Sequence, residues 1–232
     1  MSPVPALCLV ASAAFGQAFE AATIKPNHSG SPEASTYNYP GRVVATNQTL
    51  ASYLTQAFEI RDYQLSGPKW LESDRYDLNA KLPAGAERKT APAMLRTLLI
   101  ERFKIEFHRD TKEMPAFGLV AGKNGARVQS SREAGSSTSM GPYLFRGKKI
   151  PLTRLAEHLS NILGRPVLDL TDLTGEYDID LKWAAEDQRA EMAAGPSLVT
   201  ALQEQLGLRL ESRKAPIPIL VIDRMERVPA GN

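Results

Sequence analysis

Cysteine is nearly absent from this sequence: Cys8 is the only one in 232 residues. It lies within the apolar N-terminal stretch, so the chain after that stretch has none. Disulfide frameworks, zinc–thiolate sites, iron–sulfur clusters and cysteine nucleophiles are therefore excluded there. A fold without such crosslinks must rely on its hydrophobic core, and a chain of this length can supply one.

An excess of one charge is also missing. Lys and Arg number 28 and Asp and Glu number 26, which gives a net charge of +2. This balance does not favour nucleic acid or an anionic membrane as a partner. No apolar run approaches the ~20 residues of a membrane-spanning helix, and the 43% hydrophobic content is typical of a globular protein.

The first 18 residues carry no charged side chain and contain an apolar segment from Ala6 to Ala14. Gly16 and Ala18 place small residues where a signal peptidase needs them, so the segment resembles a secretory signal peptide cleaved near Ala18. We therefore expect a periplasmic or secreted protein. The stretch has no Lys or Arg ahead of its apolar part, which leaves open a true N-terminus further upstream.

Alternating strands and amphipathic helices follow one another along the rest of the chain. Helices are predicted over 50–58, from Thr90 with Met94, Leu95, Leu98 and Leu99 inward, over 152–162, and after Ser197 with Leu198, Leu202 and Leu206 inward. Strands are predicted at 19–24, 42–45, 75–82, 103–107, 114–120, 167–170, 177–183, 208–210 and 217–222. Residues 28–39 and 184–195 are predicted loops. The fold class is thus α+β, with mainly antiparallel sheets and helices packed on one face.

The two halves of the sequence share one order of elements, helix–strand–strand–helix–strand–strand. Arg75–Leu78 matches Glu176–Ile179 through a shared Tyr-Asp pair, and the next helix and strand keep the same spacing. This pattern predicts an internal duplication, with Tyr76 equivalent to Tyr177, Phe103 to Leu206 and Phe107 to Leu210. The expected organisation is a signal peptide at 1–18, a first unit at 19–128, a Ser- and Gly-rich linker at 129–141 and a second unit at 142–232.

Several longer motifs resemble the soil-associated conserved hypothetical family, a domain of unknown function from soil bacteria. They are Phe19–Pro26, Leu65–Trp70, Arg75–Asp77, Met94–Leu99 with Arg102-Phe103, His108-Arg109, Thr111–Glu113, Leu163–Val167, Leu202–Pro216 and Val221–Asp223. The resemblance implies export and a stand-alone domain, and no activity. Each half is also loosely similar to the short N-terminal domain of secretins and TonB-dependent receptors, small periplasmic interaction modules, on the pattern of Ser197–Ile222.

No catalytic, metal or cofactor motif is visible in the sequence. The three histidines, His28, His108 and His158, do not stand at metal-ligand spacing, and His158 is expected on a helix surface. Nucleophile elbows, phosphate loops and dinucleotide fingerprints are absent. We therefore predict no catalytic residue, no cofactor and no metal.

Two residue sets invite a binding interpretation. The acidic residues around Asp178 and Asp180 are expected to be a solvated strand edge, with a cation site as the alternative. Aromatic and basic residues could form a binding groove, and the alternative is that the aromatic rings simply pack the sheets. The groove would comprise Trp70, Tyr76, His108, Arg109 and Tyr177.

These observations predict an exported, non-catalytic protein that binds an envelope protein or a cell-surface component. One alternative is an extracytoplasmic hydrolase, which would need a pocket holding His108 and an acid such as Asp77 or Asp178. Another is a sensory domain that receives a small ligand.

Overall fold

The computed structural model describes residues 18–184 and 195–231. The predicted signal segment before Ala18 and most of the predicted loop 184–195 lie outside the described residues. The described chain forms two compact units, the first from residues 18–110 and 218–231, the second from residues 111–217 without 185–194. In the described ranges, no helix is long and apolar enough to cross a membrane.

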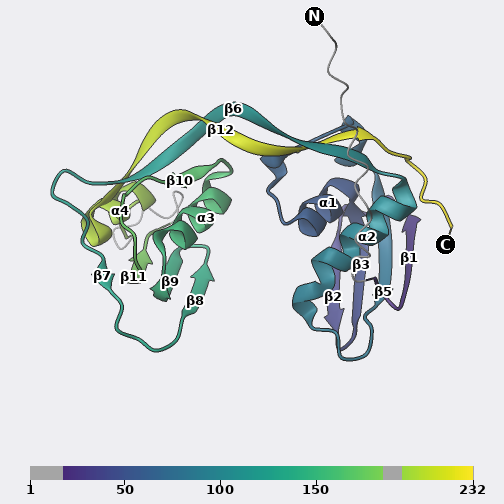
Figure 1. Cartoon of the computed structure of the whole chain (residues 1–232), viewed down its shortest axis with the longest axis horizontal. Coiled ribbons are helices and arrows are strands. Elements are labelled where there is room, and N and C mark those ends of the chain that lie inside the picture. Colours follow the sequence, from purple (N-terminus) through teal and green to yellow (C-terminus); the bar gives the residue numbers. More distant parts are fainter. Residues whose placement is uncertain (1–17, 185–194, 232) are drawn as a thin grey trace, which may run out of the picture. The chain divides into compact units, whose positions relative to one another are not determined.

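The first unit holds two helices and a four-stranded antiparallel sheet in the order β1-β5-β3-β2 (Figure 1). Its strands are β1 (Ala21–Pro26), β2 (Ser35–Tyr39), β3 (Arg42–Thr49), the short β4 (Leu65–Ser66) and β5 (Arg75–Lys81). Its helices are α1 (Leu50–Phe58) and α2 (Ala91–Phe103), with short 3-10 helices at Asp62–Gln64, Lys69–Leu71 and Arg88–Thr90.

The second unit repeats that composition, with a four-stranded antiparallel sheet in the order β7-β11-β9-β8 (Figure 1). Its strands are β7 (Gln129–Ser130), β8 (Ser137–Gly141), β9 (Leu144–Ile150), β10 (Val167–Asp169) and β11 (Tyr177–Lys182). Its helices are α3 (Leu152–Leu163) and α4 (Leu198–Leu206). The predicted α+β class with mainly antiparallel sheets is confirmed.

Two long strands form the centre of a third sheet, ordered β10-β6-β12-β4. They are β6 (Glu106–Ala121) and β12 (Leu208–Arg224), and each contributes residues to both units. The sequence predicted each as two separate strands. Their middle residues, such as Asp110–Lys112 and Glu211–Lys214, are exposed and polar, so they lack the alternation that signals a strand.

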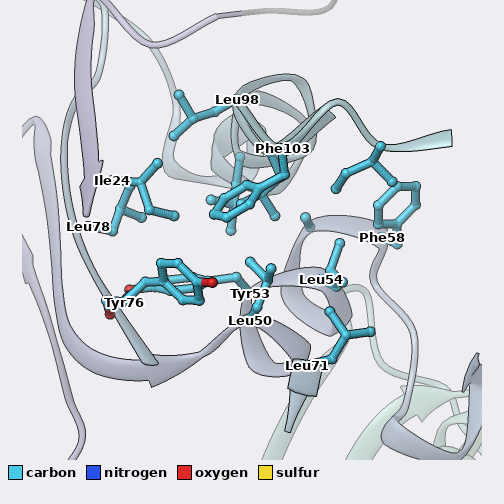
Figure 2. Packing of buried hydrophobic residues seen from close by; sticks show 14 of the residues in the cluster. Ile24, Leu50, Tyr53, Leu54, Phe58, Leu71, Tyr76, Leu78, Leu98 and Phe103 are labelled. Atoms are coloured by element: carbon cyan, nitrogen blue, oxygen red, sulfur yellow. Dashed lines mark hydrogen bonds between the residues drawn. The ribbon is translucent and has the colours of Figure 1, made fainter. Parts of the chain in front are cut away.

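Each unit has its own hydrophobic core beneath its helices. In the first unit, residues of α1 and α2 pack on those of β1, β3 and β5, and Figure 2 shows the rings of Tyr53, Tyr76 and Phe103 among them. Tyr76 and Phe103 meet edge to face at 5.2 Å between ring centroids. In the second unit, Leu155, Leu202 and Leu206 are buried with residues of β9 and β11.

Helix ends follow from the local sequence. The hydroxyls of Thr49 and Ser197 accept hydrogen bonds from the backbone N–H of Ser52 and Thr200, which begins α1 and α4. Gly164 and Gly207 end α3 and α4 in the left-handed conformation. Thr90 occupies the N-cap position of α2 but makes no capping hydrogen bond with its side chain, because its hydroxyl donates to the carbonyl of Glu87 in the preceding 3-10 turn.

The sequence predicts that residues 129–141 link the two units, and the structure differs here. Residues 129–141 lie inside the second unit and contain β7 and the edge strand β8. Residues 28–39, expected to be a loop, likewise end in the edge strand β2. Residues of β8 are exposed on both faces, apart from the half-buried Gly141, so the strand needs no apolar alternation and has the composition of a loop. The first unit ends near Asp110 rather than at 128, and the chain returns to it at Pro218.

The two antiparallel sheets place their shared Tyr-Asp pairs alike. Tyr76 on β5 pairs with Gln48, two residues before α1, and Tyr177 on β11 pairs with Ile150, two residues before α3. Phe103 and Leu206 are the last residues of α2 and α4. Duplicated units would produce this correspondence, and the duplication itself stays a prediction.

Truncation of Leu202 to Ala tests the core of the second unit. Leu202 on α4 is completely buried. We expect the variant to lose about 2–5 kcal/mol of unfolding free energy, because the cavity forfeits both transfer and packing energy. Urea denaturation measures it, and Val199→Ala on the same helix, where the side chain is 51% exposed, serves as a control expected to change stability by less than about 0.5 kcal/mol. A Leu202→Ala variant as stable as this control would contradict the packing.

Candidate functional site

A polar pocket of about 660 Å³ opens on the first unit and is the candidate site. Its walls come from the end of β1 and the loop after it, the bend before α1, the start of β5 and the C-terminal segment after β12. The lining residues are Pro26, Asn27, His28, Gly30, Ser31, Asn47, Ser73, Asp74, Arg75, Tyr76, Arg227 and Val228. Most of them are polar, so the pocket suits a ligand that forms hydrogen bonds.

Asp77 does not line the pocket but holds two residues that do, Asn27 and Asn47. One oxygen of its carboxylate, Oδ1, accepts hydrogen bonds from the Asn27 side-chain amide at 2.7 Å and the Asn47 backbone N–H at 2.8 Å. Asn47 is buried and has a left-handed backbone with φ 59°. Its side-chain amide donates to the carbonyls of Ser31 and Glu33, which anchors the loop that forms one wall.

Two other lining residues, Asp74 and Arg227, form an ion pair although they are far apart in the sequence. Nη2 of Arg227 donates to Oδ1 of Asp74 at 2.7 Å, and Nε donates to Oδ2. The hydrogen bond from Arg227 holds the pKa of Asp74 below its ordinary value. Each charged group is therefore hydrogen-bonded by the other.

Two of the predicted groove residues meet at Arg227. The guanidinium lies over the ring of Trp70 at 5.8 Å from the centroid, and the Tyr76 hydroxyl donates to the Arg227 carbonyl at 2.7 Å. Burial, with the nearby Asp74 charge, raises the pKa of Tyr76 to about 12, so its hydroxyl keeps its proton. The sequence did not indicate Asp74 or Arg227, since no local motif marks a pair so distant along the chain.

Gly67 explains part of the Leu65–Trp70 motif that presents Trp70. A Cβ at this position would lie 2.6 Å from Cδ1 of Leu71 and 3.3 Å from Cβ of Ile222. A larger residue would have to displace the Leu71 side chain and press on Ile222, so this close packing favours glycine in the motif.

His108 is paired, but outside this pocket. Its Nδ1 lies 2.9 Å from both carboxylate oxygens of Asp223, and this hydrogen bond raises the pKa of the imidazole. The hydrolase alternative calls for a pocket that holds His108 and an acid such as Asp77 or Asp178. Instead the partner is Asp223, and the side chains of His108 and Asp223 are 53% and 46% exposed. Arg109 is an exposed neighbour on β6.

Tyr177 belongs to the second unit and is buried in its core, as Tyr76 is buried in the core of the first. Of the predicted groove residues, Trp70 and Tyr76 both contact Arg227. A groove that comprises all five residues stays a prediction.

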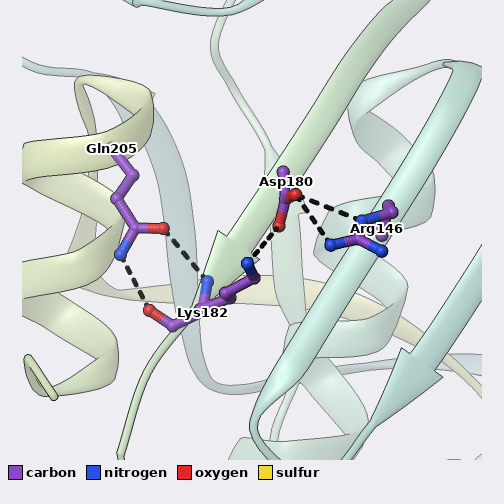
Figure 3. Close-up of polar contacts among 4 residues, drawn as sticks. All are labelled: Arg146, Asp180, Lys182 and Gln205. Carbon is purple, nitrogen blue, oxygen red and sulfur yellow. Dashed lines mark hydrogen bonds and ion pairs between the residues drawn. The ribbon is translucent and has the colours of Figure 1, made fainter.

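The acidic strand of the second unit is neutralised by basic neighbours. Asp178 accepts from Nζ of Lys148 and from the backbone N–H of Lys149, both at 3.1 Å. Hydrogen bonds from Ser131 and from the Lys149 backbone lower the pKa of Asp178. Arg146 donates twice to Asp180, and Lys182 lies 4.0 Å from it (Figure 3). Within the described residues, no cluster of three or more His, Cys, Asp or Glu side chains could hold a metal ion.

His158 lies inside the second core rather than on a helix surface as predicted. It is 8% exposed, its ring lies 5.1 Å from Phe145 and 6.2 Å from Trp183 between centroids, and Nε2 has no hydrogen-bond partner in the described part of the chain. Burial lowers the pKa of this imidazole. Its flanking leucines, Leu155 and Leu159, already marked the buried face of α3.

The buried imidazole predicts a pH-dependent stability. Below the ordinary pKa of about 6.5, the unfolded chain binds a proton that the folded core resists, so unfolding free energy falls as the pH drops from 7 to 5. His158→Phe should remove this decline in urea titrations at each pH. His108→Gln is the matched control with the opposite sign, because the raised pKa of His108 adds stability at low pH that is lost as pH rises above about 6.5. An unchanged decline in His158→Phe would contradict this assignment.

Comparison with known proteins adds one match. Residues 51–225 match a family model described as a protein of unknown function (DUF3738). No curated protein and no solved structure matches the chain. The matched range includes Ser73, Asp74, Arg75 and Tyr76 of the pocket and ends before Arg227.

Proposed function

The chain belongs to the DUF3738 family of proteins of unknown function, and we propose that it is an exported, non-catalytic protein that binds an envelope protein or a cell-surface component. Export rests on the uncharged apolar residues before Phe19 and the small residues Gly16 and Ala18. The association with soil bacteria and the likeness to the secretin domain stay predictions.

The pocket of the first unit is the observation that carries the binding proposal. Asp74 and Arg227 are hydrogen-bonded to each other, Arg75 donates to the Asn47 carbonyl, and the nearby Asp77 accepts from two donors. A pocket whose carboxylate is already paired, and whose other walls carry mainly amides and hydroxyls, suits a polar part of a partner held by hydrogen bonds.

The C-terminal segment supports the same role by completing the pocket wall. Beyond the Asp74–Arg227 pair, backbone N–H groups of Glu226 and Ala230 donate to the carbonyls of Phe103 and Arg102, both at 2.7 Å. The Arg102 side chain returns a hydrogen bond to the Ala230 carbonyl at 3.0 Å. The wall is therefore fixed before a partner arrives, which reduces the entropy lost on binding.

Filling the pocket should abolish partner capture. Val228 lines the pocket and is 68% exposed, so Val228→Trp adds bulk there without disturbing the core. We expect immobilised wild-type chain to retain a component of the native host's envelope fraction, and Val228→Trp to retain at least tenfold less. Val199→Trp, at an exposed position of the second unit, is the matched control and should capture as the wild type does. Equal capture by all three chains would contradict the pocket as the binding site.

Export is tested separately by N-terminal sequencing of the protein purified from its native host. We expect the sequence to begin near Phe19, because the peptidase cleaves after small residues such as Ala18. Recovery of the full-length chain from the cytoplasm would overturn export while leaving the binding pocket untouched.

A further inference from the structure

We propose that the edge strand β2 is a self-association surface, at which it pairs antiparallel with β2 of a second copy of this chain. Among the described residues, β2 is the outermost strand of its sheet, bonded to β3 on one side only. An edge of this kind presents unpaired backbone donors and acceptors, a template for another strand.

The four outer strands of the two antiparallel sheets differ in how they are protected. β1 carries Lys25 and Pro26, and β7 is only two residues long, so both are poor templates. β2 (Ser-Thr-Tyr-Asn-Tyr) and β8 (Ser-Thr-Ser-Met-Gly) contain neither a charge nor a proline. One edge of each sheet is thus protected and the other is open.

The absence of charge favours a second copy as the occupant. When a strand pairs antiparallel with its own copy, the central residue faces itself across the two-fold axis, and a charge there would meet a like charge. In the pairing that overlaps all of Ser35–Tyr39, Tyr37 lies opposite Tyr37 and Ser35 opposite Tyr39.

The exposed rings on β2 distinguish it from β8. Tyr37 and Tyr39 have large aromatic side chains, yet they are 56% and 53% exposed. Their rings stack with the centroids 6.4 Å apart. Pairing with a second copy would bring four rings together on one face, as opposite and diagonal cross-strand neighbours. On β8 only Met140 is large and apolar, and Gly141 has no side chain to pack.

Sedimentation velocity of the full chain over a range of concentrations tests the proposal. We expect a reversible monomer–dimer equilibrium whose dissociation constant rises at least tenfold in Tyr37→Lys and in Tyr37→Glu, since each places like charges on the axis. An equimolar mixture of these two variants should regain the dimer, because lysine then faces glutamate.

Met140→Lys on β8 is the matched control, since Met140 is also 56% exposed and lies on the corresponding edge. It should leave the dissociation constant within twofold of the wild type. Circular dichroism checks that all variants remain folded. A chain that stays monomeric at every concentration, a mixture that does not restore the dimer, or an equal loss in Met140→Lys would each overturn the proposal.

Discussion

In each antiparallel sheet, a residue whose backbone is in the left-handed conformation donates a hydrogen bond to an aspartate. The rest of the sheet's geometry depends on this bond. The Asn47 backbone N–H donates to Asp77 at 2.8 Å, and the Lys149 backbone N–H donates to Asp178 at 3.1 Å. Asn47 and Lys149 have φ of 59° and 50°, an unfavourable conformation for residues with a side chain. In each sheet the strand pairing shifts near this bond, and a helix begins within three residues of it. The Tyr-Asp pair thus packs its tyrosine in the core while its aspartate sets the bend into α1 or α3.

The elements that the sequence predicted well are those with one buried face. In β5 and β11 apolar and polar residues alternate, and in helices such as α1 the apolar residues recur at helical spacing. In both cases one side of the element contacts the core. The sequence predicts a loop and a linker where the edge strands β2 and β8 lie, because their composition is polar. It predicts two strands in place of each of β6 and β12, because their middle residues are polar and exposed. Hydrophobic patterns in a sequence arise from burial. Strands that are stabilised mainly by backbone hydrogen bonds therefore cannot be predicted from such patterns.

The candidate site could be anticipated only in part for a related reason. Trp70 and Tyr76 stood out as aromatic residues beside a Gly-Pro turn and a Tyr-Asp pair, and both contact Arg227. Their partner lies more than 150 residues away along the chain, and the His108 partner Asp223 is also distant. Such pairs follow from how the end of β12 and the segment after it return to the first unit, which no local spacing encodes. The contacts of Arg227 also complete the pocket wall, so the site depends on this return of the chain.

Amide hydrogen exchange measured by NMR tests the central constraint most directly. If the carboxylates of Asp77 and Asp178 accept hydrogen bonds from the backbone N–H groups of Asn47 and Lys149, these two amides are protected from exchange in the native protein. Asp77→Ala should abolish protection at Asn47 and leave Lys149 protected, and Asp178→Ala should do the reverse. Rapid exchange at both amides in the wild type, or protection that survives removal of the carboxylate, would contradict the account.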